Sequence, residues 1–205
     1  MYRHYVFDID GTLIDSEAAA IPSLHQVAVD LLGQDLPAEH LYQAFGMSAD
    51  DTMRWLGIAD VERGHKLWNH YFADYRHLIT VFDGILPVLD ALKAKGASLG
   101  LLTSKNRYEY EHDFLPLGLE PRFDTVILAD DSETHKPQAG PMLAYLAKSG
   151  AKPEEVLFIG DSVHVMGCGK NAGVDHALAL WGRRSDDPSI EATYRLHTPA
   201  ELLSL

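Results

Sequence analysis

The sequence predicts a three-layer α/β fold, in which helices cover both faces of a parallel β-sheet, with a helical lobe inserted near the N-terminus. Short, continuous apolar runs alternate with helical patterns along most of the chain, which is typical of strands buried on both faces of a parallel sheet. About 60 residues between the first two strands carry only helical patterns, too long a stretch for an ordinary crossover. The chain has 205 residues, 46% apolar and 23% charged, which suffices for one domain with such an insert.

The N-terminal part of the chain accounts for the first strand and the insert. The apolar run Tyr5–Phe7 predicts a buried strand, and the turn-prone pair Asp10-Gly11 follows it. Ser48 and Asp51 resemble a capping box, with Asp in place of the usual Glu, and indicate that a helix opens there. Apolar residues at helical spacing then predict three helices in the insert: Ala18–Leu32, a helix opened by Ser48 and running through Leu56, and Val61–Leu78.

The remainder of the chain alternates between the two kinds of pattern. Buried strands are expected at four further runs: Leu99–Leu102, Thr125–Leu128, Val156–Ile159 and Ala177–Leu180. Helices are expected between and after them: Leu86–Lys95, Arg107–Leu115, Met142–Lys148, His164–Ala172 and a closing helix Pro199–Leu203. We therefore expect a Rossmann-like core formed by residues 1–15 and 80–205, and a helical cap domain formed by residues 16–79.

Polar side chains stand where the predicted strands end. Asp8 and Asp10 follow the first strand, Thr103-Ser104 the second and Asp161 the fourth, while Lys136 lies in a loop before a helix. Ligands of open α/β sheets bind beyond the carboxyl ends of the strands, so these groups are expected in one crevice. Carboxylates brought together need a cation, and hard oxygen ligands suit Mg²⁺. With a lysine and a hydroxyl, they form a reasonable site for phosphoryl transfer.

Four segments resemble the motifs of one known family. VFDIDGTLID (6–15) resembles the nucleophile motif of the haloacid dehalogenase-like superfamily, and LLTSKN (101–106) its hydroxyl motif. HKP (135–137) resembles its lysine motif, and FIGDS (158–162) its acidic motif. The four occur in the family's order. The helical insert is positioned like the cap of the subgroup that contains phosphoglycolate phosphatase, β-phosphoglucomutase and a bacterial pyrophosphatase.

The resemblance implies a role for each matched residue. Asp8 would attack phosphorus and carry an aspartyl-phosphate. Asp10 would protonate the leaving group and then deprotonate the attacking water. Thr103, with Ser104 beside it, would bind the phosphoryl oxygens. Lys136 would neutralise the charge on the nucleophile and the phosphate.

The same resemblance implies a Mg²⁺ cofactor held by Asp8, the backbone carbonyl of Asp10, and Asp161. Two departures from the family's pattern bear on it. The acidic motif usually has a second Asp four residues after the first, where this chain has Val165. The lysine motif usually continues KPDP, where this chain has Gln138-Ala139. The first departure concerns the surroundings of the metal, which can change metal affinity by about 10–100-fold, and His164, Asp130 or Asp131 are candidates to replace the missing group.

A few other residues are ambiguous from the sequence. Lys105 follows the hydroxyl motif and is either a phosphate ligand or exposed, and His135 and His164 lie near the expected crevice. The histidines at 65, 70 and 77 lack the spacing of a helical metal site and are expected on the surface of the cap. Cys168 is the only cysteine, so the chain forms no internal disulfide, and a packing role is expected for it.

Charge and composition narrow the class of partner. The formal net charge of −13 disfavours nucleic acid and anionic membranes, so the expected partner is a small phosphorylated metabolite drawn in by a local positive site. With no evident signal peptide and no apolar run long enough to span a bilayer, a cytoplasmic enzyme is expected. The oligomeric state stays open. So do two alternatives to a phosphatase or pyrophosphatase: a sugar-phosphate mutase of the β-phosphoglucomutase type, and a non-catalytic binding protein that retains the fold.

Overall fold

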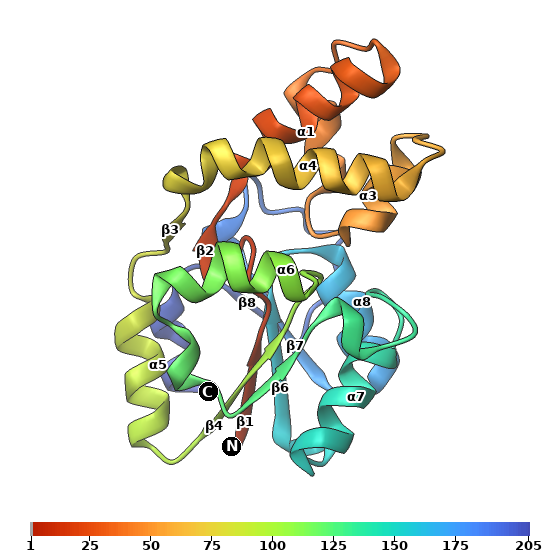
Figure 1. The fold of residues 1–205 in the computed structure, drawn as a ribbon. Helices are drawn as coiled ribbons and strands as arrows, with labels where there is room; N and C mark the ends of the chain where they lie inside the picture. The colour runs from red at the N-terminus through yellow and green to blue at the C-terminus, as the bar shows by residue number, and fades with distance from the viewer. Residues whose placement is uncertain (1) are drawn as a thin grey trace.

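Six parallel strands form the central sheet of the computed structural model, which describes residues 2–205 (Figure 1). In spatial order the strands are β5 (Thr125–Ile127), β4 (Ser98–Leu102), β1 (His4–Phe7), β6 (Val156–Gly160), β7 (Asp175–Ala179) and β8 (Tyr194–Leu196). Every neighbouring pair is parallel, and β1 pairs with both β4 and β6. The residues that follow β1, β4 and β6 therefore meet at one edge of the sheet.

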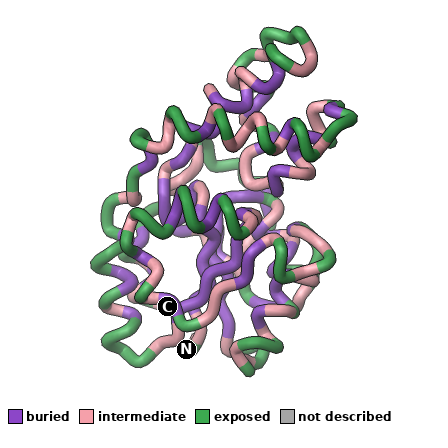
Figure 2. Tube along the Cα trace, in the orientation of Figure 1, coloured by how far each residue is buried: buried purple, intermediate pink, exposed green. Residues whose placement is uncertain are grey.

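Both faces of the sheet are buried, as its continuous apolar strands predict. Successive side chains of a strand point to opposite faces, and in β1 Tyr5 and Phe7 join one apolar cluster while Val6 joins the other. The first cluster lies under α5 (Ile85–Ala94), and the second under α7 (Gly140–Ser149) and α8 (Val163–Ala172). Figure 2 shows the strands buried between helices with exposed outer faces. The predicted three-layer, Rossmann-like fold is confirmed.

Further helical segments complete the core. The predicted helix at Arg107–Leu115 is present but irregular, because α6 (Arg107–Glu109) continues into a π-helical turn and then a 3₁₀ turn. The closing helix is a 3₁₀ helix, η9 (Pro199–Ser204). Short 3₁₀ turns also occur at Glu120–Arg122, Ala129–Asp131, Pro153–Glu155 and Leu180–Gly182.

The helical insert lies beyond the carboxyl ends of the sheet strands (Figure 1). It consists of α1 (Glu17–Leu32), α2 (Ala38–Leu41), α3 (Ala49–Trp55) and α4 (Val61–Tyr75), with 3₁₀ turns at Tyr42–Ala44 and Arg76–Leu78. The insert has an apolar cluster of its own, which includes Leu24, Val27 and Met53. It begins and ends at a two-stranded antiparallel ribbon made of β2 (Ile14–Asp15) and β3 (Thr80–Val81).

Four further features differ from the sequence-based expectations. The strand expected to be the last, β7, is followed by β8, whose sequence has Arg195 between Tyr194 and Leu196 and so forms no continuous apolar run. The β2–β3 ribbon and the short helix α2 were not expected either. The capping box at α3 is only half formed: Ser48 accepts the Asp51 N–H, but the Asp51 carboxylate binds the Ser48 hydroxyl and His135 instead of returning to the backbone.

Among the described residues, none of the helices combines the length and the apolar character that crossing a bilayer requires.

Candidate active site

Asp8 stands at the end of β1, the central strand, and pairs with the lysine expected from the sequence. Its side chain is almost fully buried, and its Oδ2 accepts a hydrogen bond from Lys136 Nζ at 2.6 Å. The other oxygen, Oδ1, accepts the N–H of Ile9 at 2.8 Å. Burial raises the pKa of Asp8, and the nearby Lys136 ammonium opposes that rise. The structure therefore brings together two of the predicted residues that are 128 positions apart in the chain.

Asp10 reaches the same edge because the chain turns at Gly11. Gly11 has a φ of +71°, a region that favours glycine. A Cβ added there would lie 2.3 Å from Asp161 Oδ2, so only glycine permits the approach of that carboxylate. Asp10 Oδ1 accepts a hydrogen bond from the Ser16 hydroxyl at 2.5 Å and lies 3.2 Å from Lys105 Nζ.

Asp161 follows β6 and has a buried carboxylate that lacks protein partners. Its Oδ1 forms no hydrogen bond with the described residues. Burial, followed by the negative charge of Asp8, raises the pKa of Asp161 to about 8. Arg183 donates to the backbone carbonyl oxygen of Asp161, not to its carboxylate. An unpaired buried carboxylate beside a second carboxylate is unfavourable unless a cation compensates it.

The donor set fits Mg²⁺. Asp8 and Asp161 supply carboxylate oxygens near the turn that carries the Asp10 carbonyl, and the orphaned Asp161 Oδ1 lacks the partner that a cation would provide. Within residues 2–205 no group of three or more His, Cys, Asp or Glu side chains has the arrangement of a metal site. Mg²⁺ does not require one, since it keeps several waters and binds through one or two carboxylates together with a substrate phosphate.

The two hydroxyl residues after β4 have different surroundings. Thr103 is buried, and its hydroxyl oxygen accepts the N–H of Lys105 at 3.1 Å, which leaves its proton to donate. Ser104 lines the cavity that also contains Asp8 and Asp10, here called the main cavity, but its hydroxyl donates to the carbonyl oxygen of Gly46 at 3.1 Å. The Ser104 side chain thus joins the core to the helical insert, and its expected contact with substrate would require that bond to break.

Lys105 is the residue that the sequence left most ambiguous. It is buried, 8% exposed, so the alternative of an exposed lysine is wrong. Its Nζ lies 3.2 Å from Asp10 Oδ1 and 3.4 Å from Asp113 Oδ2, and Arg76 pairs with the other oxygen of Asp113 at 2.7 Å. Burial lowers the pKa of Lys105, but Asp10 and Asp113 outweigh that effect and hold it above the ordinary value. Asp113 gave no signal in the sequence, because it lies on an irregular helix outside all four motifs.

The histidines expected on the cap surface are not all there. His65 is largely buried and pairs with Glu109 of α6 at 2.9 Å and with Asp50 at 3.3 Å, so the surface expectation is wrong for it; His70 and His77 are exposed as expected. His135 binds Asp51 of α3 at 2.9 Å, which directs it toward the insert. His164 lies beside Asp161 in a neighbouring cavity, and burial lowers its pKa.

The candidates for a missing metal ligand do not form a second carboxylate site. Val165 is fully buried in the apolar cluster beneath α7 and α8. Asp130 and Asp131 are exposed, and each accepts a backbone N–H, from Arg107 and Leu128 respectively.

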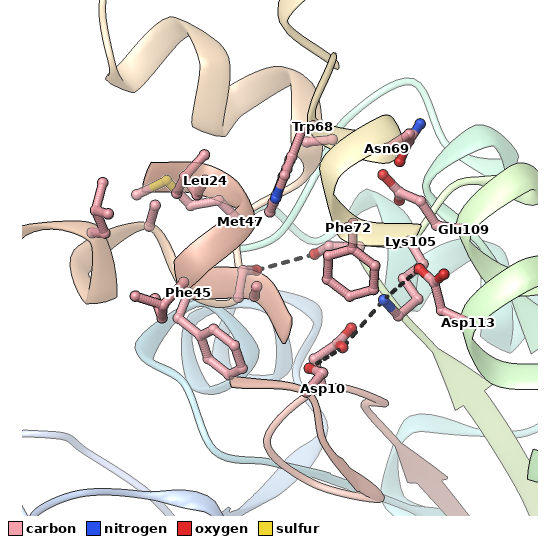
Figure 3. A pocket seen from close by; sticks show the side chains of 18 of the residues that line it. Asp10, Leu24, Phe45, Met47, Trp68, Asn69, Phe72, Lys105, Glu109 and Asp113 are labelled. Atoms are coloured by element: carbon pink, nitrogen blue, oxygen red, sulfur yellow. Dashed lines mark hydrogen bonds and ion pairs between the residues drawn. The ribbon is translucent and has the colours of Figure 1, made fainter. Parts of the chain in front are cut away.

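The main cavity lies between the core and the insert. Asp8 and Asp10 both line it. Figure 3 shows Asp10 at one end, and apolar side chains of the insert form most of the wall. A second cavity on the far side of Asp161 is lined by Glu17, Tyr42, Arg183 and Arg184. The reacting end of the site is therefore covered by residues of the insert.

The fold and the site together define a class of protein. The family model described as "Haloacid dehalogenase-like hydrolase" matches residues 5–179, and the chain belongs to this family. It is therefore an enzyme, a hydrolase, as the sequence predicted.

Individual relatives and solved structures are similar to the chain over nearly its whole length. The chain is 31% identical over 211 residues to the pyrophosphatase PpaX of Bacillus velezensis, covering 98% of this chain and 94% of that protein. Its structure is similar to that of a protein from Lactobacillus plantarum proposed to be a phosphoglycolate phosphatase, with a TM-score of 0.90, 29% identity, and coverage of 100% and 99%. A magnesium-bound hydrolase from Bacillus subtilis, YfnB, shares the fold, with a TM-score of 0.74, 21% identity, and coverage of 99% and 97%. The prediction of an enzyme of the phosphatase class agrees with the names of the first two.

Proposed function

We propose that the protein is a Mg²⁺-dependent phosphohydrolase that acts on a small phosphate monoester or pyrophosphate through an aspartyl-phosphate on Asp8. The observation that carries the proposal is the meeting of Asp8, Asp10, Lys136 and Asp161 at one edge of the sheet, with Asp8 and Lys136 2.6 Å apart. The pyrophosphatase and phosphoglycolate phosphatase names of its relatives support it.

In the first step a carboxylate oxygen of Asp8 attacks phosphorus as the bond from phosphorus to the leaving oxygen breaks. The N–H of Ile9 and the Lys136 ammonium fix the orientation of the carboxylate, so little reorganisation is needed before attack. Asp10 gives its proton to the leaving oxygen. Ser16 and Lys105 both contact Oδ1 of Asp10, so Oδ2 remains available for proton exchange.

In the second step Asp10 takes a proton from water, the water oxygen attacks phosphorus, and the bond from Asp8 to phosphorus breaks. Phosphate leaves and both carboxyl groups return to their starting states. Lys136 balances the negative charge of Asp8 and of the phosphoryl oxygens, and the Thr103 hydroxyl donates to one of those oxygens. Bound Mg²⁺, held by Asp8, the Asp10 carbonyl and Asp161, would supply further charge neutralisation.

Catalysis and substrate selection are assigned to different segments of the chain. We assign catalysis to a core domain of residues 1–15 and 80–205, and substrate selection and exclusion of water to a cap domain of residues 16–79. The wall of the main cavity, which comes mostly from the insert, supports this division. The proposed partner is a small phosphorylated metabolite. The single cysteine, which allows no internal disulfide, favours a cytoplasmic location.

Replacing Asp8 with asparagine tests the proposal. With Mg²⁺ and a panel of small phosphate esters and pyrophosphate, Asp8→Asn should lower phosphate release by about 10³-fold or more, because an amide is a poor nucleophile of nearly the same shape. The control is Asp90→Asn, an exposed aspartate of α5 that pairs with Arg122. Circular dichroism checks the fold, and mass spectrometry excludes deamidation back to aspartate. A folded, amide-bearing variant that keeps more than a few per cent of the activity removes Asp8 from the nucleophile role.

A further inference from the structure

The main cavity has an apolar wall where the leaving group of a substrate would lie. Leu24, Phe45, Met47, Trp68 and Phe72 line it on the side away from Asp10 (Figure 3). Trp68 uses its one polar atom elsewhere, since its Nε1–H donates to the Ser23 hydroxyl at 2.9 Å. Its indole ring therefore offers the cavity only an apolar surface. A substrate group placed here loses its water and gains no hydrogen bonds from these five side chains.

The charged residues around the cavity are already paired with one another. Lys105 is the only cation among the described lining residues, and it is shared between Asp10 and Asp113. Glu109 binds His65 through Oε1 and the N–H of Asn106 through Oε2. Apart from Asp8, three carboxylates thus face one lysine. A second phosphate or a carboxylate on the leaving group would meet net negative charge and no free cation.

The space is also small. The enclosed part of the cavity measures about 70 Å³. A compact leaving group is therefore a better match than a large sugar or a nucleoside.

We infer that the preferred substrates are phosphate monoesters of small, uncharged alcohols with a compact apolar body. The inference rests on the proposed function, because it places the phosphoryl group at Asp8 and the alcohol against the apolar wall. It departs from pyrophosphate and from phosphoglycolate, whose leaving groups carry negative charge that this wall does not balance.

Two isosteric esters test the inference. In 2-methylbutyl phosphate, methyl groups stand where glycerol 3-phosphate has its two hydroxyls, and both esters release a primary alcohol. With Mg²⁺, kcat/KM should be at least about tenfold higher for 2-methylbutyl phosphate, since a polar group in an apolar pocket loses its hydrogen bonds to water. Phosphoglycolate and pyrophosphate are measured in parallel as anionic competitors, and both should fall below the apolar ester.

A pair of variants on α1 connects the preference to the wall. Leu24→Ala removes side-chain carbons from the cavity lining and should lower the ratio of the two kcat/KM values, 2-methylbutyl over glycerol phosphate, by about tenfold. Val27→Ala is the matched control: Val27 is buried in the same apolar cluster but does not line the cavity, so the ratio should stay unchanged. Because a ratio is compared, a general loss of stability in either variant cancels.

The outcomes separate the two proposals. A preference for the apolar ester that falls in Leu24→Ala and not in Val27→Ala supports the inference. If phosphate is released but glycerol phosphate, phosphoglycolate or pyrophosphate is the best probe, the inference is overturned and the proposed function stands. The inference is also overturned if the preference survives in Leu24→Ala. If none of the four probes releases phosphate with Mg²⁺, the proposed function fails and the inference falls with it.

Discussion

Val165 is a buried packing residue of the core, although its position in the sequence suggested a group missing from the metal site. It occupies the position where the family pattern usually has a second aspartate, which suggested a missing group near the metal. In the structure its side chain is fully buried and packs on β6: a Cβ added at Gly160 would lie 2.6 Å from a Val165 methyl carbon. Glycine on the strand and valine on the helix therefore fit together, and the position serves packing.

Introducing a charge at this position should damage the core. We expect Val165→Asp to lower the free energy of unfolding by roughly 3–5 kcal/mol, because it buries a carboxylate with no partner. The Mg²⁺ concentration that gives half-maximal activity should not change. Thermal melts and a Mg²⁺ titration of activity, done on both proteins, measure the two effects. A Mg²⁺ midpoint that falls about tenfold would restore the idea of a missing ligand.

Unlike Val165, Asp161 is a buried carboxylate, and its negative charge lowers the stability of the folded protein when no metal is bound. Its pKa in the folded protein, about 8, is above the ordinary value, so the folded state holds a proton that the unfolded chain has already lost. Without metal, the stability of the protein should therefore fall as the pH rises from about 4 to about 8. The full cost is present above that range, and a bound cation would remove it.

The variant Asp161→Asn separates this electrostatic cost from the metal. Without Mg²⁺ at pH 8.5, it should melt roughly 5 °C or more above the natural protein, and the difference should shrink toward pH 5. Adding Mg²⁺ should raise the melting temperature of the natural protein and leave that of the variant unchanged. An equal response to Mg²⁺ in both proteins would show that Asp161 is not a ligand.

At the scale of elements, polar contacts connect the helical insert to the core across the cavity. His65 of α4 binds Glu109 of α6, and the Ser104 hydroxyl binds the carbonyl oxygen of Gly46. The hydrogen bond with Glu109 is the largest contribution that raises the pKa of His65 above its ordinary value. Stability from the His65 pair is fully present below about pH 6.5 and is lost as the pH rises through the raised value.

The contribution of this contact should depend on pH with a definite sign. We expect His65→Gln to lower the melting temperature by roughly 2–4 °C more at pH 6 than at pH 8.5, since only the protonated imidazole gains from Glu109. His70→Gln, an exposed histidine of the same helix, is the control and should show the same small effect at both values. A larger loss at pH 8.5 than at pH 6 would contradict the charged pair.

How far the elements could be predicted depended on their length and regularity. Helices such as α1 show one period over many residues, and strands such as β1 contain a continuous apolar run, so their bounds agree with expectation within a few residues. The ribbon strands β2 and β3 have two residues each, and β8 has Arg195 between two apolar residues, so none of the three contains such a run. They exist because of tertiary pairing, which the local sequence does not encode.

At the scale of the whole molecule, topology explains why most of the candidate site was accessible to sequence reasoning. Asp8, Thr103 and Asp161 follow strands that lie side by side, so predicting the strands was enough to predict that they converge. The contacts of Lys105 with Asp113 and of His65 with Glu109 depend on how α4 and α6 pack, over separations that no motif spans. The apolar cavity wall could not be predicted either, because it combines residues from α1, from the segment that holds Phe45 and Met47, and from α4.

The β2–β3 ribbon has a consequence for how such a protein can change over evolutionary time. Ile14 pairs with Val81 and Asp15 with Thr80, so the two ends of the helical insert leave the core at the same place. To the core, more than sixty residues are topologically equivalent to one hairpin loop. Helices of another length or composition can be accommodated there without moving a strand of the sheet. If the insert selects the leaving group, as we propose, new preferences would arise by substitution there, while the carboxylates at the strand ends keep their places.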